Sequence, residues 1–311
     1  MKNKNSLIYV AGHTGLVGSA LVRKLKEQGY ANLLLATRSD VDLRDQNAVK
    51  YFFEKNKPEF VFMTAGKVGG IHANITYPAD FIHDNILITT NIIHNSYVTN
   101  VKKLLFLSCS CMYPRNCPQP IKEEFLLTGD VEKTNYAYAA AKIAGLKMIK
   151  SYREQYNCDF ISAVANNTYG PVNRHNLENS HVIPALIKKF LSAVQKNKKE
   201  VTLWGTGNPK REFLYTDDLA DALIFLMKNF SEKEHINIGT GVEISMKELA
   251  DIMKSMIGFR GKIIWDTTKP DGVPRKFLDV LKINSLGWRA KVTLKQGLEE
   301  TISEYIKKQI N

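Results

Sequence analysis

Gly12-His-Thr-Gly15-Leu-Val-Gly18 follows directly on an apolar run, Leu7–Ala11, and an amphipathic stretch begins immediately after it. A strand, a glycine-rich turn and a helix in this order are typical of the first βαβ unit of a dinucleotide-binding fold. Glycines allow close approach of the backbone to a pyrophosphate, and the helix N-terminus supplies unpaired N–H groups. The sequence therefore predicts a bound dinucleotide, with a tight turn that holds no ligand as the alternative. The residues expected to contact it are Gly12, His13, Thr14, Gly15, Leu16, Val17 and Gly18.

Short apolar runs alternate with longer amphipathic stretches through the first half of the chain. The apolar runs lie at 7–11, 33–37, 60–65, 104–109 and 160–165, and the helix-like stretches lie near 16–28, 46–55, 78–98 and 137–156. Strands that alternate with helices predict an α/β fold with a Rossmann-type, doubly wound parallel sheet. Most of the runs are apolar throughout, as expected of parallel strands that are buried on both faces.

The regular alternation ends after Gly170-Pro171. Beyond this point helices are expected near 182–197 and 217–229, and strands near 201–204, 212–216 and 236–238. We predict a dinucleotide-binding domain made of 1–168 plus 212–240. A smaller, discontinuous α/β substrate domain would comprise 169–211 plus 241–311.

The net charge is the unusual feature of the composition. The 311 residues include 43 Lys and Arg against 31 Asp and Glu, which leaves +12 at pH 7. Such an excess suits nucleic acid, an anionic membrane surface or small anionic ligands, and a solvated lysine-rich surface is the plainer explanation. The sequence has no recognition-helix signature and no apolar run long enough to span a membrane. We therefore expect neither nucleic acid nor a membrane as a partner.

The cysteines predict free thiols rather than a disulfide framework or a metal site. They are Cys109, Cys111, Cys117 and Cys158, and they form no C-x-x-C pair. Their spacing matches no common zinc pattern, so no metal is expected. The N-terminal apolar run is too short for a secretion signal, which favours a cytoplasmic protein with reduced thiols.

The end of the second apolar run bears on the choice between NAD and NADP. NAD-binding folds usually carry an acidic residue there for the ribose 2′-hydroxyl, whereas NADP-binding folds place an arginine nearby. Arg38 and Ser39 stand at this position and suit a 2′-phosphate, provided that Asp40 turns away. Asp42 and Leu43 follow and are placed near the adenine. We predict NADP(H), with a solvated Arg38 as the alternative.

Tyr138 and Lys142 are four residues apart on a predicted helix, so their side chains share one face. A nearby ammonium lowers the pKa of a phenol and makes it usable as an acid or base. Tyr51 and Lys55 show the same spacing, so context has to separate the two pairs. Only Tyr138 follows a strand end rich in small polar groups, Ser108-Cys-Ser-Cys-Met-Tyr-Pro. Open α/β sheets bind ligands at that end of their strands.

The glycine turn and the Tyr138/Lys142 pair resemble the extended short-chain dehydrogenase/reductase family. Further stretches resemble one branch of it, the GDP-L-fucose synthases, which are NADPH-dependent GDP-4-keto-6-deoxymannose 3,5-epimerase-reductases. They include Ala65-Gly-Lys-Val-Gly-Gly-Ile-His-Ala-Asn, Cys111-Met-Tyr-Pro, Asn179-Ser-His-Val-Ile-Pro-Ala-Leu, Trp204-Gly-Thr-Gly and Lys269-Pro-Asp-Gly-Val-Pro-Arg-Lys276. The resemblance runs from about residue 7 to residue 290.

The resemblance implies specific roles. Tyr138 would donate a proton to O4 of the sugar as hydride reaches C4, and Lys142 would hold the nicotinamide ribose. Cys111 and His181 would form the base/acid pair that inverts C3 and C5. The C4 ketone acidifies these positions, and a thiol and an imidazole both titrate near neutral pH. Further contacts are implied for the cofactor by Ala65, Asn167 and His181, and for the substrate by Asn167, Lys189, Trp204, Arg211, Asp271 and Lys276.

One position departs from the family pattern. Short-chain reductases normally place Ser or Thr four residues before the tyrosine of the strand-end motif, which here is Tyr113. That position holds Cys109, and a thiol is a weak hydrogen-bond donor. Either Cys109 itself acts there, or Ser110 or Ser108 takes over after a local shift of the backbone.

These observations favour an NADPH-dependent 4-reductase of a GDP-4-keto-6-deoxy sugar with C3/C5 epimerisation. A C4 reductase without epimerase activity, acting on a different GDP-4-keto sugar such as a GDP-heptose, is a close alternative. An alternative of another class is a catalytically idle NADP-binding regulatory protein. By resemblance, the helices near 78–98 and 137–156 would form a homodimer interface.

Overall fold

The computed structural model describes residues 1, 3–171, 182–269 and 271–310, without the side chains of 308–310. Six parallel strands form the main sheet, in the order β2-β1-β3-β4-β5-β9. Their bounds are β1 Ile8–Ala11, β2 Leu33–Leu34, β3 Phe60–Met63, β4 Lys103–Cys109, β5 Phe160–Ala165 and β9 Ile236–Ile238. The predicted doubly wound parallel sheet is thereby confirmed.

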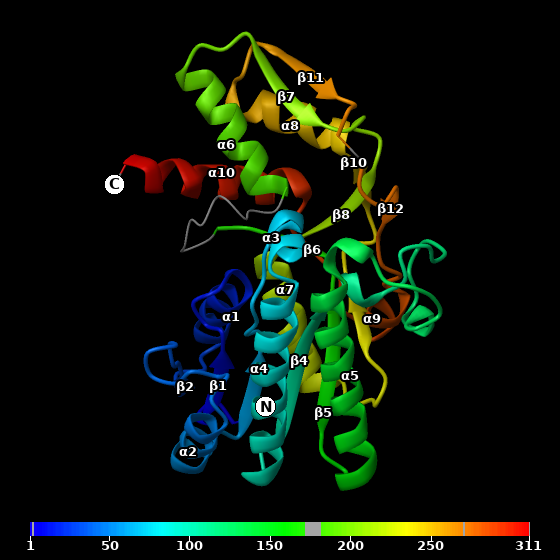
Figure 1. Cartoon of the computed structure of the whole chain (residues 1–311). Helices are drawn as coiled ribbons and strands as arrows, with labels where there is room; N and C mark the ends of the chain where they lie inside the picture. The colour runs from blue at the N-terminus through cyan, green and yellow to red at the C-terminus, as the bar shows by residue number, and fades with distance from the viewer. Residues whose placement is uncertain (2, 172–181, 270, 311) are drawn as a thin grey trace.

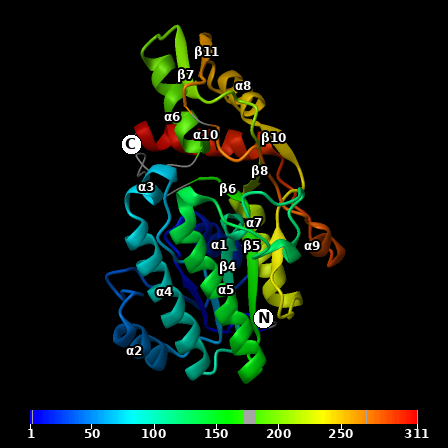
Figure 2. The ribbon, with the colours of Figure 1, turned by 45° about the vertical axis from the view of Figure 1, so that its right-hand side comes forward.

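Helices cover both faces of this sheet, as Figures 1 and 2 show. α1 (Leu16–Glu27) and α7 (Thr216–Asn229) pack on one face, where Ile8 and Val10 point. α2 (Gln46–Asn56), α4 (Pro78–Val98) and α5 (Tyr136–Tyr156) pack on the other, where Tyr9 and Ala11 point. Successive residues of β1 therefore serve two separate apolar cores, which explains why the strand is apolar throughout.

The second strand is shorter than the sequence predicts. Only Leu33–Leu34 pairs with β1, although the apolar run continues to residue 37. The chain turns at Thr37, whose backbone N–H donates to the Asp40 carboxylate at 2.7 Å. This side-chain hydrogen bond stabilises a turn and ends the extended stretch early.

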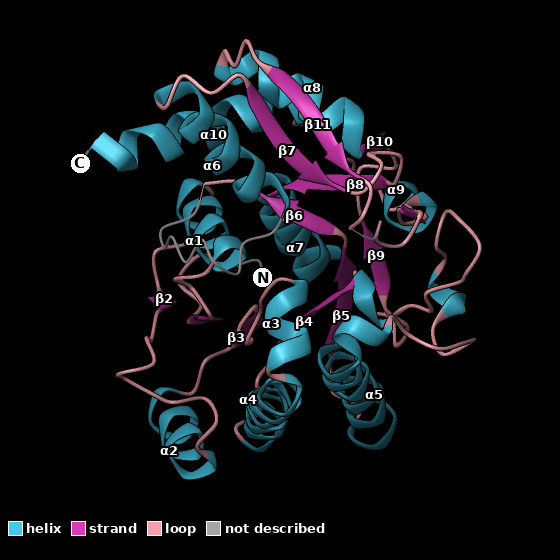
Figure 3. Cartoon of the chain, turned by 45° about the horizontal axis from the view of Figure 1, so that its top comes forward, coloured by secondary structure: helices cyan, strands magenta, loops and turns pink. Residues whose placement is uncertain are grey.

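A second layer of structure lies beyond the carboxyl ends of β4 and β5 (Figure 3). β8 (Lys210–Tyr215) is its central strand and pairs with β6 (Asn167–Tyr169), β10 (Glu243–Ser245) and β12 (Arg275–Lys276). β7 (Glu200–Trp204) and β11 (Lys262–Asp266) form a separate parallel pair. The accompanying helices are α6 Val182–Gln195, α8 Met246–Ile257 and α10 Leu294–Ile310. β6 follows β5 after one residue, so this layer sits directly over the sheet end.

The remaining short elements connect these layers. They are α3 Ile71–Thr76, α9 Leu281–Ser285 and the 3-10 turns Ser110–Met112, Glu123–Phe125 and Lys133–Asn135. Among the described residues, none of the helices combines the length and apolar character that a membrane crossing requires.

Candidate active site

The glycine turn after β1 is packed too closely for larger side chains. Gly12 has φ +85°, and a Cβ on it would lie 2.8 Å from the Cα of Ala65, just beyond β3. A Cβ on Gly18 would lie 2.1 Å from the carbonyl oxygen of Gly12. The turn therefore folds flat against the ends of β1 and β3, between the strands where the order of the sheet reverses. This is the position at which open α/β sheets bind their ligands.

The groups around the turn fit a dinucleotide. Gly15 caps α1 without a side-chain hydrogen bond, so no side chain covers the N–H groups of the first helical turn. His13 has a buried Nδ1 without a hydrogen-bond partner. Burial is the main cause that lowers the His13 pKa, so the ring is neutral near pH 7. An open helix N-terminus and an unsatisfied buried nitrogen are both features that an anionic ligand can satisfy.

The loop after β2 presents Arg38 rather than an acid. Both the backbone N–H and the hydroxyl of Thr37 donate to the Asp40 carboxylate at 2.7 Å, which lowers the Asp40 pKa. Asp40 therefore turns back into its own loop. Ser39 places its hydroxyl 2.7 Å from that of Thr37. The side chain of Arg38 is 72% exposed and makes one ion pair, with Asp42 at 3.4 Å.

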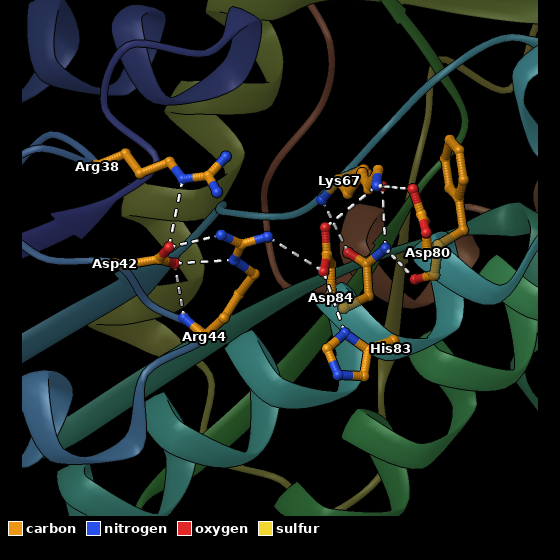
Figure 4. A network of polar contacts seen from close by, with 9 residues as sticks. Arg38, Asp42, Arg44, Lys67, Asp80, His83 and Asp84 are labelled. Atoms are coloured by element: carbon orange, nitrogen blue, oxygen red, sulfur yellow. Dashed lines mark hydrogen bonds and ion pairs between the residues drawn. The ribbon is translucent and has the colours of Figure 1, made fainter. Parts of the chain in front are cut away.

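A chain of charges runs from Arg38 towards α4 (Figure 4). Arg44 binds the Asp42 carboxylate through two nitrogens, at 2.6 and 3.0 Å, and holds the pKa of Asp42 well below its usual range. Arg44 also lies 3.4 Å from Asp84, which Lys67 contacts at 3.2 Å. Asp42 is thus held by ion pairs with two arginines. Its contact with the adenine stays a prediction. Neighbouring Leu43 is partly buried, and its carbonyl accepts from the Asn91 amide at 3.0 Å.

Tyr138 and Lys142 stand in the first turns of α5, next to the end of β4. Lys142 is 5% exposed, and its Nζ donates to the carbonyl of Leu107 at 3.1 Å. This Nζ lies 5.8 Å from the centre of the Tyr138 ring. It also lies 3.7 Å from the position that a Cβ on Gly66 would take, so Lys142 reaches across to the loop after β3. The structure therefore brings Lys142 next to the loop after β3, whose residue Ala65 packs against Gly12 of the glycine turn.

Cys109 takes the position beside the Tyr138 hydroxyl. The two side chains hydrogen-bond each other. Neither serine substitutes, because Ser108 donates to the Met112 sulfur at 3.4 Å and Ser110 donates to Asn166 at 2.9 Å. Of the alternatives left open by the sequence, these hydrogen bonds favour Cys109 itself, because both serine hydroxyls donate to other groups.

Cys109 and Cys111 also hydrogen-bond each other, and we call them the thiol pair. The hydrogen bond from Cys111 and the charges of Lys142 and Lys276 lower the pKa of Cys109 to about 6. The pKa of Cys111 is raised, because it keeps the proton of the hydrogen bond and is buried. The pair therefore carries one negative charge near neutral pH.

The pKa of Tyr138 departs from the sequence-based expectation. Burial raises it, and the charge of Cys109 and Cys111 raises it further. Burial also lowers the pKa of Lys142. Tyr138 is therefore fully protonated, as a proton donor must be.

Lys276, from the second layer, lies within electrostatic range of the thiol pair. Lys276 on β12 lies opposite Arg211 on β8 in register. Burial lowers the pKa of both, and the charges of Cys111 and Cys109 partly offset this for Lys276. Asn167, just after β5, donates to the carbonyl of Glu212 at 3.0 Å and presents an exposed side chain nearby.

The other predicted substrate contacts lie on β7, on α6 and in the neighbouring loops of the second layer. Trp204, at the end of β7, is 68% exposed, and the Nζ of Lys269 lies 5.9 Å from its ring centre. Asp271 accepts from the N–H and hydroxyl of Thr206 at 2.8 and 2.6 Å, which ties the two loops together. Lys189 on α6 donates to the carbonyl of Thr202 at 3.0 Å. His181 lies outside the described residues.

Glu212 is a site residue that the sequence did not point to. It is 0% exposed, and its carboxylate accepts from the backbone N–H groups of Thr240, Gly241 and Leu278 at 2.6, 2.7 and 3.0 Å. Asn166 donates to the same carboxylate at 2.9 Å. One buried carboxylate thus joins β5, β8, the loop after β9 and the strand that carries Lys276. The pattern Arg-Glu-Phe-Leu gave no sign of this, because an acid in a strand is normally exposed.

Comparison with known proteins agrees with this geometry. A family model described as the NAD dependent epimerase/dehydratase family matches residues 8–239. The putative GDP-L-fucose synthase 2 of Arabidopsis thaliana is 55% identical over 98% of this chain and 93% of its own. The chain belongs to the NAD-dependent epimerase/dehydratase family. The resemblance to GDP-L-fucose synthases is therefore confirmed.

Two solved structures from Campylobacter jejuni are also similar to the present chain over nearly its whole length. A GDP-6-OMe-4-keto-L-xylo-heptose reductase has a TM-score of 0.92 and 41% identity, with 99% of both chains covered. A GDP-mannoheptose C4 reductase solved with NADP bound has a TM-score of 0.89 and 40% identity, covering 98% of this chain and 100% of its own. The glycine turn, Arg38 and Lys142 fit the cofactor that the second structure contains.

Proposed function

We propose that the protein is an NADPH-dependent reductase of a GDP-linked 4-keto-6-deoxy sugar that also epimerises C3 and C5. The observation that carries this proposal is the position of Tyr138, hydrogen-bonded to Cys109 and on the same helix as buried Lys142, at the carboxyl end of β4. A protonated phenol is a suitable acid for a ketone oxygen that gains negative charge.

The residues of the chain divide the reduction among them. NADPH, when bound, supplies the hydride. Tyr138 donates its proton to O4 of the sugar, and Cys109 orients the Tyr138 hydroxyl. Lys142 is held by the carbonyl of Leu107 and stabilises negative charge that develops on the phenol.

Epimerisation requires a base that reaches the carbons beside the ketone. Cys111 is buried next to Cys109 and shares its hydrogen bond, so the thiol pair can take up a proton from C3 or C5. His181 is proposed as the acid on the opposite face, by family resemblance. The pair also keeps negative charge close to Tyr138, which favours the protonated phenol for the later reduction.

The cations of the second layer suit the diphosphate of GDP. Arg211 and Lys276 are adjacent on β8 and β12, and neither makes an ion pair with a carboxylate among the described residues. Buried cations of this kind bind phosphate oxygens with charge-assisted hydrogen bonds. The exposed ring of Trp204 provides a surface on which guanine can stack.

NADPH consumption tests this proposal. Addition of GDP-4-keto-6-deoxy-D-mannose should oxidise NADPH, whereas GDP-mannose, which lacks the ketone, should not. In deuterated water the product should carry deuterium at C3 and C5, and Cys111→Ser should abolish that incorporation. Unchanged exchange in Cys111→Ser would remove the epimerase part of the proposal. No NADPH oxidation with any GDP-4-keto sugar would favour an idle NADP-binding regulator.

A C4 reductase of a GDP-heptose is the second candidate. Its support is the similarity of 40–41% to two reductases whose names specify heptose substrates. The two candidates differ in exchange: a C4 reductase without epimerase activity incorporates no solvent deuterium at C3 or C5.

We also propose a homodimer in the cytoplasm. α4 and α5 lie side by side on the outer face (Figure 2), and Tyr97 and Tyr156 stack there at 4.2 Å between ring centres, with Tyr156 42% exposed. Aromatic side chains of this kind are enriched in interfaces. Sedimentation at the monomer mass of 35.2 kDa would contradict the dimer.

The proposed location in the cytoplasm is supported by the four cysteines, which are unpaired, as is usual in a reducing compartment.

A further inference from the structure

Two cysteine side chains interact with each other beside the reacting tyrosine. Cys109 ends β4, and Cys111 lies in the 3-10 turn Ser110–Met112 that follows directly. Their side chains hydrogen-bond each other, so no large movement is needed to bring the sulfurs together. Orientation of the Tyr138 hydroxyl needs only a hydrogen-bonding group at position 109. The capacity of a thiol to be oxidised is not used by the proposed reaction.

We propose that the thiol pair is a peroxide-sensitive site, and that its oxidation to a Cys109–Cys111 disulfide reversibly inactivates the enzyme. This inference goes beyond the proposed function and rests only on its reductase part.

The surroundings of the pair favour the reactive form of the thiol. Lys142 from α5 and Lys276 from β12 both lie within electrostatic range, and Tyr138 donates a hydrogen bond. The hydrogen bond with Cys111 and the charges of the two lysines lower the pKa of Cys109 to about 6. A partly exposed thiolate next to a second thiol is the arrangement found in redox-sensing cysteines.

The other two cysteines lack these features. Burial raises the pKa of both Cys117 and Cys158, so their thiols stay protonated at neutral pH. Cys158 lies just before β5, at the opposite end of the sheet from the thiol pair. Peroxide should therefore react first at Cys109.

The reaction with hydrogen peroxide balances in two steps. The Cys109 thiolate attacks one oxygen of the peroxide, so that an S–O bond forms, the O–O bond breaks and hydroxide leaves. The sulfur is oxidised by two electrons to a sulfenic acid. The Cys111 sulfur, deprotonated as it attacks, then displaces the oxygen: an S–S bond forms, the S–O bond breaks and water leaves. Two thiols and one peroxide thus give one disulfide and two waters.

The disulfide would remove both functions of the pair. The sulfur of Cys109 would lose the negative charge to which Tyr138 donates, and the pair could no longer take up a proton. A thiol reductant such as dithiothreitol reverses the bond and should restore activity.

The test uses the full-length enzyme treated with stoichiometric hydrogen peroxide. Peptide mapping by mass spectrometry should show loss of two hydrogen atoms from the segment that contains both cysteines. NADPH oxidation should fall about tenfold or more in parallel and recover with dithiothreitol.

The pH dependence of the reaction is a second measurement. The rate at which peroxide modifies Cys109 should rise as pH rises through about 6, because the thiolate is the attacking species. Oxidation at Cys117 or Cys158 alone, or a Cys109–Cys111 disulfide with full activity, would overturn the proposal.

Variants keep the test independent of the substrate. Cys111→Ser should stop at a sulfenic acid on Cys109 that dimedone captures, and Cys109→Ser should form no disulfide. Cys158→Ser is the matched control and should form the disulfide like the parent. Because mass is the readout, the thiol chemistry can be judged even if the proposed sugar is not turned over. Dimedone labelling of Cys111→Ser at Cys117 instead of Cys109 would contradict the assignment of the attacking sulfur.

Discussion

The glycine turn and the thiol pair lie at the same end of the main sheet, but the chain builds them differently. The turn comes from one continuous segment, Gly12–Gly18, between β1 and α1. The groups around the thiol pair come from β4, α5 and β12, which together span more than half of the chain. We therefore expect cofactor binding to depend mainly on one continuous segment. The catalytic step should depend on the relative positions of segments that are far apart in the sequence.

The carboxylate of Glu212 holds these distant segments together through hydrogen bonds. It links the strand that carries Arg211 with the backbone that follows Lys276 and with Asn166 after β5. At the glycine turn, by contrast, Gly12 and Gly18 are held by close contacts with backbone atoms. Variants in the two regions should consequently fail in different ways.

Replacement of Tyr138 by Phe should give the largest effect. Loss of the proton donor should lower kcat for keto-sugar reduction by about 10²- to 10⁴-fold. NADPH binding, measured by fluorescence titration, should stay near the parent value, because the glycine turn is untouched. Tyr51→Phe is the matched control, since Tyr51 has the same spacing to a lysine but is 65% exposed on α2. Equal losses in both variants would contradict the assignment of Tyr138.

Glu212→Gln should loosen the junction between the layers. The amide places N–H donors against backbone N–H groups, and we expect a loss of about 3 kcal/mol in the free energy of unfolding, measured by urea denaturation. KM for the sugar should rise more than KM for NADPH. The exposed Glu200 on β7 supplies the control, and Glu200→Gln should change stability by less than about 0.5 kcal/mol. A parental stability for Glu212→Gln would show that the carboxylate is dispensable.

Gly18→Ala should affect the cofactor more than the sugar. The added Cβ would lie 2.1 Å from the carbonyl oxygen of Gly12, so the turn must open. We expect the Kd for NADPH to rise about 30-fold, equivalent to about 2 kcal/mol. Gly129→Ala is the control, because its Cβ would meet only Pro114, at an ordinary distance of 3.5 Å. Tight NADPH binding by Gly18→Ala would argue against a dinucleotide at this turn.

Arg38→Ala should give the smallest effect and the most selective one. Its exposed guanidinium contacts the 2′-phosphate in our proposal, so the Kd for NADPH should rise about tenfold, by about 1.4 kcal/mol. Binding of NADH should not change. Arg260→Ala, at an exposed arginine of the second layer, should leave both cofactors unaffected. An equal rise of the Kd for NADPH and for NADH would mean that Arg38 does not bind the 2′-phosphate.

Local patterns were enough to predict most of the fold. The strands and helices of the main sheet follow from apolar runs and amphipathic stretches, and α4 occupies the predicted range, 78–98. The second strand was overpredicted, because the hydrogen bonds between Thr37 and Asp40 outweigh the apolar character of the run. The two domain ranges stay a prediction.

The site was predictable only where residues close in sequence act together. Tyr138 and Lys142 share a helix face, so their spacing reveals them. Glu212 acts through partners from three distant segments, and the charge chain from Asp42 to Lys67 spans two loops, so neither leaves a local pattern. The direction of the Tyr138 pKa was also missed, because the sequence cannot show the burial of the phenol or the nearby charge of Cys109 and Cys111, which both raise that pKa.

Product stereochemistry is the most direct test of the proposed chemistry. The enzyme would be incubated with NADPH in deuterated water, once with GDP-4-keto-6-deoxy-D-mannose and once with a GDP-4-keto-heptose, and the products examined by NMR. We predict turnover of the 6-deoxy sugar to a product reduced at C4, inverted at C3 and C5 and deuterated at both carbons. Reduction of the heptose alone, with no deuterium at C3 or C5, would contradict this.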